Sequence, residues 1–218
     1  MHTTLPIFDI TVCDYNTGNR IIMDAVYGVA AEVLPERVPI TIPYWEPFGP
    51  IALRYLEEAD LALYGGGNHL ATDAKDLFWG VTRKNVKRVR NVVLLGVGWW
   101  KYQDQPVSRE IIRILRSTLH PNLLHSVRDD YIKQKLAEAG IKNVVTTGCP
   151  SMWRLSCEHC ASIPHGMAKD VLFTFTADYT PCPERDHAVL NVLQKTYRNL
   201  YYWPQGPKDV QHIRDFDF

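Results

Sequence analysis

The sequence has no apolar run long enough to cross a membrane. A membrane-spanning helix needs about 20 consecutive apolar residues, and polar or charged residues interrupt every apolar stretch of this chain well before that length. The N-terminus also lacks the basic region and the long apolar core of a secretory signal. We therefore expect a cytoplasmic protein without a membrane span.

Neither sign of charge is in excess. Lys and Arg together number 24, Asp and Glu together number 24, and the formal net charge is zero. General nucleic-acid binders usually carry a basic excess, so we expect no nucleic-acid partner. The basic residues between Arg83 and Arg90 form a dense cluster, which we interpret as the solvated face of a helix.

Cysteine is scarce and scattered, with five residues in the chain. An odd number of cysteines without a secretory signal favours free thiols over disulfides. The alternative is a zinc site, for which the candidate ligands are Cys149, Cys157 and Cys160 with His159 or His165. Because there is a single Cys-x-x-Cys pair and no second pair at zinc-finger spacing, we expect no metal site.

Apolar runs that stop at glycines are the most informative feature present. Residues 61–64 are apolar and lead into four small or polar residues, Gly65, Gly66, Gly67 and Asn68. About 30 residues later, residues 92–95 lead in the same way into Gly96-Val97-Gly98, which predicts a strand-helix-strand crossover. Such runs are typical of strands buried on both faces of a parallel sheet. The glycines can adopt positive φ and leave N–H groups open to a ligand at the carboxyl edge of the sheet, where open α/β sheets bind ligands.

Two neighbouring features each leave two interpretations open. Trp99 follows Gly98 and either stacks on a ligand or covers the end of the sheet. A polar loop after the first predicted strand contains Asn16, Gly18 and Asn19. This loop either holds an anion at a helix N-terminus or is an ordinary strand-to-helix turn.

The order of the expected elements indicates the fold class. Strands are expected at residues 7–12, 38–42, 61–64, 92–95, 123–127, 144–147, 171–175 and 200–203, and helices at 20–33, 51–59, 74–90, 108–119, 131–139 and 184–197. Repeated strand-loop-helix units predict an α/β fold with a Rossmann-like, doubly wound parallel sheet. The glycine spacing does not match the dinucleotide-binding pattern, which argues against an NAD cofactor.

The same pattern predicts the domain organisation. We expect an N-terminal Rossmann-like domain over residues 1–155 and a linker over residues 156–170, where Pro164 and Gly166 interrupt any regular period. A fresh strand and helix then begin a second Rossmann-like domain over residues 171–218, which holds too few elements to be complete.

Three groups of residues carry a resemblance to a known family. They are Asn16-Thr17-Gly18-Asn19, then Gly65-Gly66-Gly67-Asn68, and then Ser126-Val127-Arg128-Asp129-Asp130 leading through Leu136, Gly140 and Asn143-Val144 to Gly148-Cys149-Pro150. In this order and spacing the chain resembles the polysaccharide pyruvyl transferase family over essentially its whole length.

The resemblance implies a two-domain fold similar to glycosyltransferase B, with the ligand cleft between the domains. It also implies transfer of pyruvate from phosphoenolpyruvate to two hydroxyls of a sugar in a cell-surface polysaccharide or exopolysaccharide, with no cofactor. Such chemistry needs a cationic clamp for the donor and an acid that protonates the enol carbon. Arg128 is the candidate clamp, with Asp129 beside it; the alternative is that the two residues only pin the loop and cap the next helix. No catalytic residue is assigned.

One departure from the family is visible. Members usually carry an Arg-Leu-His-Gly-like segment late in the second domain, thought to supply an Arg and a His to the donor, and nothing after Phe175 matches it. We therefore expect a family member that lacks the end of the second domain. The alternatives are a non-catalytic binding protein of the same fold and a nucleotide-sugar glycosyltransferase. An incomplete sheet with uncovered residues 201–203 also makes a homo-oligomer a hypothesis.

Overall fold

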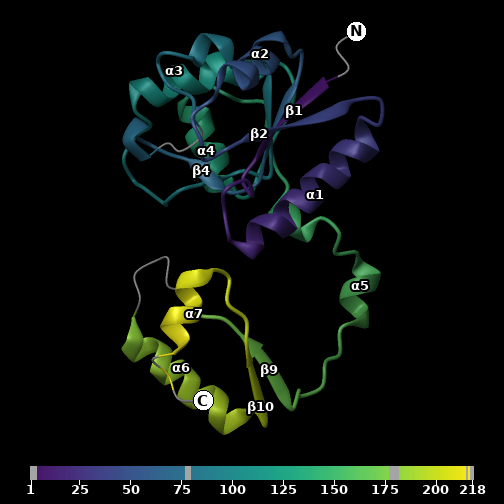
Figure 1. Ribbon diagram of the computed structural model, residues 1–218, viewed down its shortest axis with the longest axis vertical. Coiled ribbons are helices and arrows are strands. Elements are labelled where there is room, and N and C mark those ends of the chain that lie inside the picture. The colour runs from purple at the N-terminus through teal and green to yellow at the C-terminus, as the bar shows by residue number, and fades with distance from the viewer. Residues whose placement is uncertain (1–3, 77–79, 177–181, 215, 217–218) are drawn as a thin grey trace. The chain divides into compact units, whose positions relative to one another are not determined.

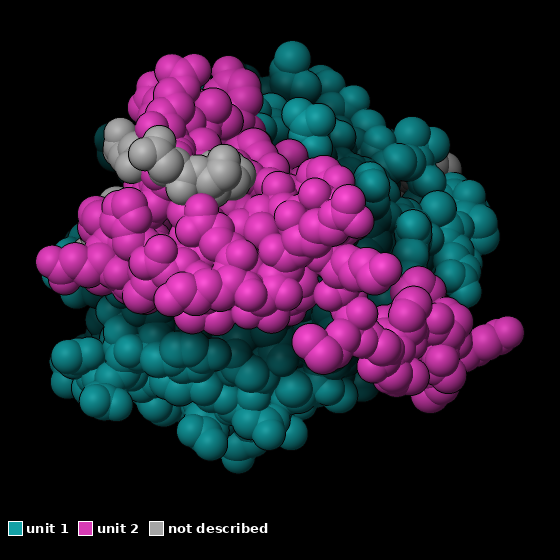
Figure 2. All heavy atoms as spheres, turned by 90° about the horizontal axis from the view of Figure 1, so that it is seen from below, with its two compact units in different colours: residues 1–14, 19–155 teal, residues 15–18, 156–218 magenta. Residues whose placement is uncertain are grey.

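A computed structural model describes residues 4–76, 80–176, 182–214 and 216 of the chain (Figure 1). The chain divides into two compact units, which Figure 2 distinguishes by colour. The first unit comprises residues 1–14 and 19–155, and the second comprises residues 15–18 and 156–218.

A parallel sheet forms the centre of the first unit. Its four strands are β1 (Thr4–Asp9), β2 (Val38–Pro43), β3 (Ala62–Gly65) and β5 (Val92–Leu95), in the order β2-β1-β3-β5. A parallel pair, β7 (His125–Val127) and β8 (Val144–Thr146), lies next to β5. The Gly96 N–H joins the two groups by donating to the Ser126 carbonyl (3.0 Å). The predicted α/β fold with a Rossmann-like parallel sheet is therefore confirmed for this unit.

The strand order reverses between β1 and β3. Helix α1 (Thr17–Val33) connects β1 to β2, and α2 (Pro50–Glu58) connects β2 to β3. Because β1 lies between β2 and β3, the two crossovers run in opposite directions, and Figure 1 shows α1 and α2 on opposite sides of β1 and β2. Ligands of open α/β sheets bind at the carboxyl ends of strands beside such a reversal.

Two amphipathic helices complete the first unit. Helix α3 (Arg109–Thr118) begins at Ser108, whose side chain accepts from the Ile111 N–H, and it buries an apolar stripe against the core. Helix α4 (Asp130–Glu138) begins at Asp129 in the same way and ends before Gly140, which adopts φ +79°.

The helix expected over residues 74–90 is wrong. The structure has two short 3₁₀ turns in its place, η1 (Ala74–Asp76) and η2 (Val86–Arg88), while residues 77–79 lie outside the described part of the chain. Gly80 adopts φ +65°, and the Asn85 side chain donates to the Gly80 carbonyl and accepts from the Thr82 N–H. These local side-chain bonds compete with helical hydrogen bonds and fold the segment into turns.

The basic cluster from Arg83 to Arg90 is consequently not one helix face. Arg83 pairs with Glu110 of α3 (2.5 Å), and Arg88 pairs with Glu57 of α2 (2.9 Å). These side chains tie the irregular crossover between β3 and β5 to its neighbouring helices.

Other boundaries differ by a few residues. The first strand starts and ends three residues earlier than expected, and β7 starts two residues later. The expected polar loop 16–19 is shorter, because residues 17–19 already belong to the first turn of α1. The glycine loops also continue into a further parallel pair, β4 (Asn68–Leu70) and β6 (Gly98–Trp99).

The second unit contains one strand-helix-strand motif. Strands β9 (Asp170–Phe173) and β10 (Asn199–Tyr202) are parallel, α6 (Pro183–Thr196) connects them, and α7 (Pro207–Ile213) follows. A short helix, α5 (Cys157–Ser162), lies within the segment expected to be a linker. The resemblance to glycosyltransferase B stays a prediction.

No helix in the described ranges is both long and apolar enough to span a membrane.

Candidate functional site

Helix α1 packs directly on the glycine triplet that follows β3. A Cβ atom on Gly65 would lie 2.7 Å from Val26 Cγ1, and one on Gly66 would lie 2.0 Å from Ile22 Cγ2. Gly66 also adopts φ +59°, which disfavours any residue with a side chain. Its N–H donates to the Leu95 carbonyl (2.8 Å). The prediction that the N–H groups of this loop are open to a ligand is therefore wrong for Gly66.

The motif that follows β8 packs on the same loops. A Cβ on Gly96 would lie 2.5 Å from Pro150 Cδ, and the Pro150 ring also approaches Gly66. The glycine loops and the Gly148-Cys149-Pro150 motif, which are far apart in the sequence, therefore meet at the carboxyl edge of the sheet.

Arg128 crosses this edge directly after β7. Its Nε donates to the Gly96 carbonyl (3.1 Å), and its Nη1 donates to Asn68 Oδ1 (2.9 Å). Gly98 leaves room for both side chains, since a Cβ there would lie 1.9 Å from Asn68 Oδ1. The third nitrogen, Nη2, is buried and has no hydrogen-bond partner among the described residues. Buried guanidinium donors are normally paired, so Arg128 retains a fixed donor that is suited to an anion.

Both oxygens of the Asp129 carboxylate accept hydrogen bonds from nearby groups of the protein. One oxygen accepts from the Ile132 N–H (3.1 Å) and caps α4, and the other accepts from the Tyr102 hydroxyl (2.9 Å). This supports the helix-capping interpretation of Asp129 rather than a direct ligand role.

His69 is a candidate that the sequence did not reveal. It is 5% exposed, and its ring lies over Gly67, where a Cβ would be 1.8 Å from Nε2. The ring packs on Tyr44 (4.2 Å between centroids) and forms a T-shaped pair with Trp45 (5.3 Å between centroids). Within the described part of the chain, neither ring nitrogen has a hydrogen-bond partner. The sequence offers little to single it out, because it shows only a histidine directly after the Gly65–Asn68 motif.

The charge state of this cluster follows from its burial. Burial, and to a lesser extent the positive charge of Arg128, lowers the pKa of His69 to about 3, so the ring is neutral near pH 7. Burial also raises the pKa of both Tyr44 and Tyr64. Arg128 is therefore a cation beside a group of neutral polar side chains.

The remaining predicted residues lie elsewhere or are occupied. Trp99 is 5% exposed and donates its ring N–H to Thr72 (3.2 Å), which supports the interpretation that it covers the end of the sheet. Asn16 and Gly18 group with the second unit, where the Asn16 side chain accepts from the Gly18 N–H (2.8 Å). Asn19 belongs to the first unit and donates to the Asp14 carboxylate.

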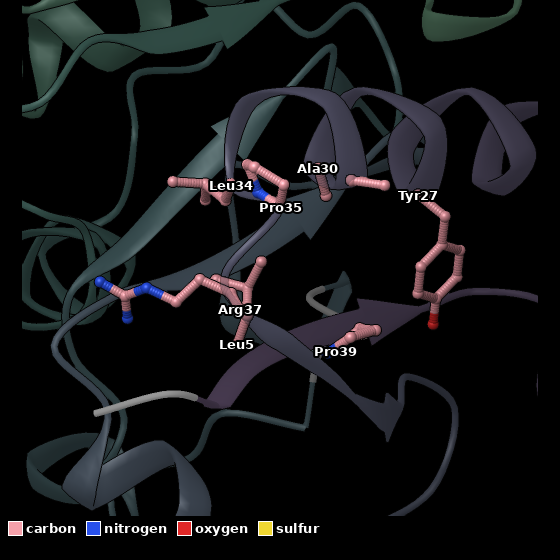
Figure 3. A pocket seen from close by; sticks show the side chains of 8 residues that line it. Leu5, Tyr27, Ala30, Leu34, Pro35, Arg37 and Pro39 are labelled. Atoms are coloured by element: carbon pink, nitrogen blue, oxygen red, sulfur yellow. The ribbon is translucent and has the colours of Figure 1, made fainter. Parts of the chain in front are cut away.

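A separate pocket of about 150 Å³ lies between α1, β1 and β2 and is lined mainly by apolar side chains (Figure 3). The Tyr27 hydroxyl donates to Asp9 (3.0 Å), and Arg37 forms two hydrogen bonds to Asp60 (2.6 and 2.9 Å). Burial contributes most to raising the pKa of Tyr27 to about 12. The polar groups of this pocket thus have hydrogen-bond partners within the fold. Arg128 Nη2 and the ring nitrogens of His69 differ from them in having none among the described residues.

All five cysteines are free. No group of three or more His, Cys, Asp or Glu side chains gathers for a metal ion in the ranges described.

The comparisons with known proteins agree with the motifs. A family model described as polysaccharide pyruvyl transferase matches residues 16–206 of the 218-residue chain, a span that includes all the motifs at the carboxyl edge. No curated protein and no solved structure gives a match.

Proposed function

Because the chain belongs to the polysaccharide pyruvyl transferase family, we propose that it binds phosphoenolpyruvate through Arg128 and transfers the pyruvyl group to a sugar. The acceptor in this proposal is a sugar of a cell-surface polysaccharide or exopolysaccharide. Two of its hydroxyls become the oxygens of a cyclic ketal.

The buried Nη2 of Arg128, which has no hydrogen-bond partner in the described part of the chain, carries the proposal. Two hydrogen bonds, to Gly96 and Asn68, hold the guanidinium in one orientation. The remaining donor is desolvated, and charge-assisted hydrogen bonds to phosphate or carboxylate oxygens are stronger away from water. An arginine held in this way is suited to an anion such as phosphoenolpyruvate.

The proposed transfer joins both sugar hydroxyls to the carbon of phosphoenolpyruvate that loses the phosphate. A proton is added to the methylene carbon of the enol, and the first sugar hydroxyl forms a bond to the neighbouring carbon. The phosphate group leaves with the bridging oxygen, and the second hydroxyl forms the other ketal bond at the same carbon. The two sugar hydroxyls release two protons. One of them balances the proton added to the methylene carbon, and the other goes to the phosphate or to the medium. Arg128 would stabilise the negative charge on the departing phosphate.

The test is thermal unfolding with phosphoenolpyruvate, and with a sugar nucleotide as a separate ligand. At a ligand concentration of 100 times Kd, binding stabilises the fold by about 2.7 kcal/mol, which is about 5–10 °C in Tm for a chain of this size. We expect this shift with phosphoenolpyruvate for the natural chain and its loss in Arg128→Gln. Arg83→Gln, which removes an exposed arginine elsewhere, is the matched control and should keep the shift.

An undiminished shift in Arg128→Gln would remove Arg128 from the donor site. A shift with the sugar nucleotide alone would favour a nucleotide-sugar glycosyltransferase. Where the donor shift is present, release of inorganic phosphate in the presence of candidate acceptor sugars tests the transfer itself.

A further inference from the structure

The buried imidazole of His69 lowers the stability of the fold relative to an apolar ring at the same position. Both of its ring nitrogens are buried without a hydrogen-bond partner among the described residues. A buried polar group that makes no hydrogen bond has lost its water without compensation. A phenylalanine would fill nearly the same space among the same aromatic rings and would avoid this penalty. The packing of the core therefore gives no reason for an imidazole at this position.

The ring is also fixed in orientation. The Tyr44 ring packs against it, the Trp45 ring meets it in a T-shaped arrangement with 5.3 Å between centroids, and Gly67 lies next to it. Any residue larger than glycine at position 67 would collide with the ring. A polar group that is fixed and unpartnered before a ligand arrives loses little conformational freedom on binding.

The surroundings of His69 favour an anionic ligand. Among the described residues, the phenol rings of Tyr44 and Tyr64 lie against it, and the positive charge of Arg128 acts on it. The phenols are neutral, so Arg128 supplies the charge that acts on the ring. The neighbouring residue, Asn68, accepts a hydrogen bond from Arg128 Nη1, which links the strand that carries His69 to the arginine.

We propose that His69 is a second contact for the anionic donor, with one ring nitrogen donating a hydrogen bond to the anion that Arg128 binds. The inference rests on the proposed function for the identity of that anion, while the chemistry it requires is only that of a phosphate or a carboxylate. A neutral imidazole has one N–H donor, and a bound anion also favours protonation of the ring because opposite charges attract.

The test compares His69→Phe with the natural chain in thermal unfolding, with inorganic phosphate and with phosphoenolpyruvate as separate probes. We expect His69→Phe to unfold at a higher temperature than the natural chain without a ligand. We also expect about tenfold more of either anion to be needed for the same shift in Tm, since loss of a charge-assisted hydrogen bond weakens binding by about that factor. Tyr44→Phe, which removes a hydroxyl from the same cluster and keeps the ring, should leave the anion response unchanged.

A second readout reports on the ring itself. In ¹⁵N-histidine NMR, the His69 signals, identified by their absence in His69→Phe, should move when phosphate is added to the natural chain and stay in place in Arg128→Gln. A residue that only fills space would not respond to phosphate.

The outcomes separate the two proposals. An equal response of His69→Phe and the natural chain to phosphoenolpyruvate overturns the His69 contact and leaves the proposed function standing. A response to inorganic phosphate that depends on His69, without tighter binding of phosphoenolpyruvate, supports the contact and counts against pyruvyl transfer. If neither anion shifts the Tm of the natural chain, the contact is wrong.

Discussion

Glycines at the carboxyl edge are required for two different reasons, a positive φ and close contact with a neighbouring side chain. Gly66 combines a positive φ with close contact to α1, because a Cβ would lie 2.0 Å from Ile22 Cγ2. Gly148 has a similarly positive φ of +79°, but no heavy atom of a described residue lies within 4 Å of the position that a Cβ would take. A comparison of substitutions at Gly66 and Gly148 therefore separates the cost of backbone strain from the cost of a steric clash.

We therefore predict that Gly66→Ala destabilises the first unit more than Gly148→Ala. Both substitutions add the strain of a left-handed conformation, about 1–2 kcal/mol. Gly66→Ala also overpacks a core contact, which adds about 1–3 kcal/mol. Urea denaturation of the two variants measures the difference, and equal losses of unfolding free energy would show that Ile22 moves aside freely.

At the scale of elements, a partly buried hydrogen bond between Asp186 of α6 and His212 of α7 links two helices of the second unit. Asp186 is 2% exposed, accepts a hydrogen bond from His212 (3.0 Å) and is also bonded by Arg185. Burial by itself would raise the pKa of Asp186, but these hydrogen bonds outweigh it and lower the pKa below its usual value of 3.8. The folded state therefore favours the ionised carboxylate.

The sign of the pH dependence follows from this lowered pKa. The contribution of Asp186 to stability is present above about pH 4 and is lost as the pH falls through the lower pKa of the folded state. We predict that Asp186→Asn reduces the stability of the second unit at pH 6 and weakens its dependence on acid. The NMR methyl signals of Leu190, followed from pH 6 to pH 3, measure this unit. If the variant and the natural chain lose the native signals at the same pH, Asp186 does not control the acid response.

At the scale of the whole molecule, the stretch of the second unit that follows residue 155 in the chain has an unusually exposed surface. Every residue from Ser156 to Asp170 is exposed, and a Cβ added at Gly166 would meet no heavy atom of the described chain within 4 Å. Exposed segments with few backbone contacts tolerate insertions well.

We predict that a six-residue Gly-Ser insertion after Gly166 changes the unfolding free energy of either unit by less than about 1 kcal/mol, because lengthening a flexible connection adds little closure entropy. The same insertion after Leu172 interrupts β9 and should unfold the second unit. Circular dichroism during thermal unfolding compares the two insertions. Equal damage from both would mean that the exposed segment is part of a folded core.

Local sequence patterns predicted the regular elements well where burial and period agree. The apolar runs that became β3 and β5, and the stripe of α3, follow from the need to bury one face of each element. The same reasoning was wrong over residues 74–90. There, basic residues at helical spacing suggested a solvated face, but Gly80 and the side chain of Asn85 favour turns.

The sequence by itself determined the family, the parallel α/β architecture of the first unit and Arg128 as the residue to examine, because motifs and strand periodicity are local properties of the chain. Only the tertiary structure decided that Arg128 contacts Asn68, 60 residues away in the sequence, and that Trp99 and Asp129 are committed to the fold. Only the tertiary structure also decided that His69 is buried with no hydrogen-bond partner for its ring among the described residues. Burial and hydrogen-bond satisfaction depend on which distant segments meet, and no local pattern records that.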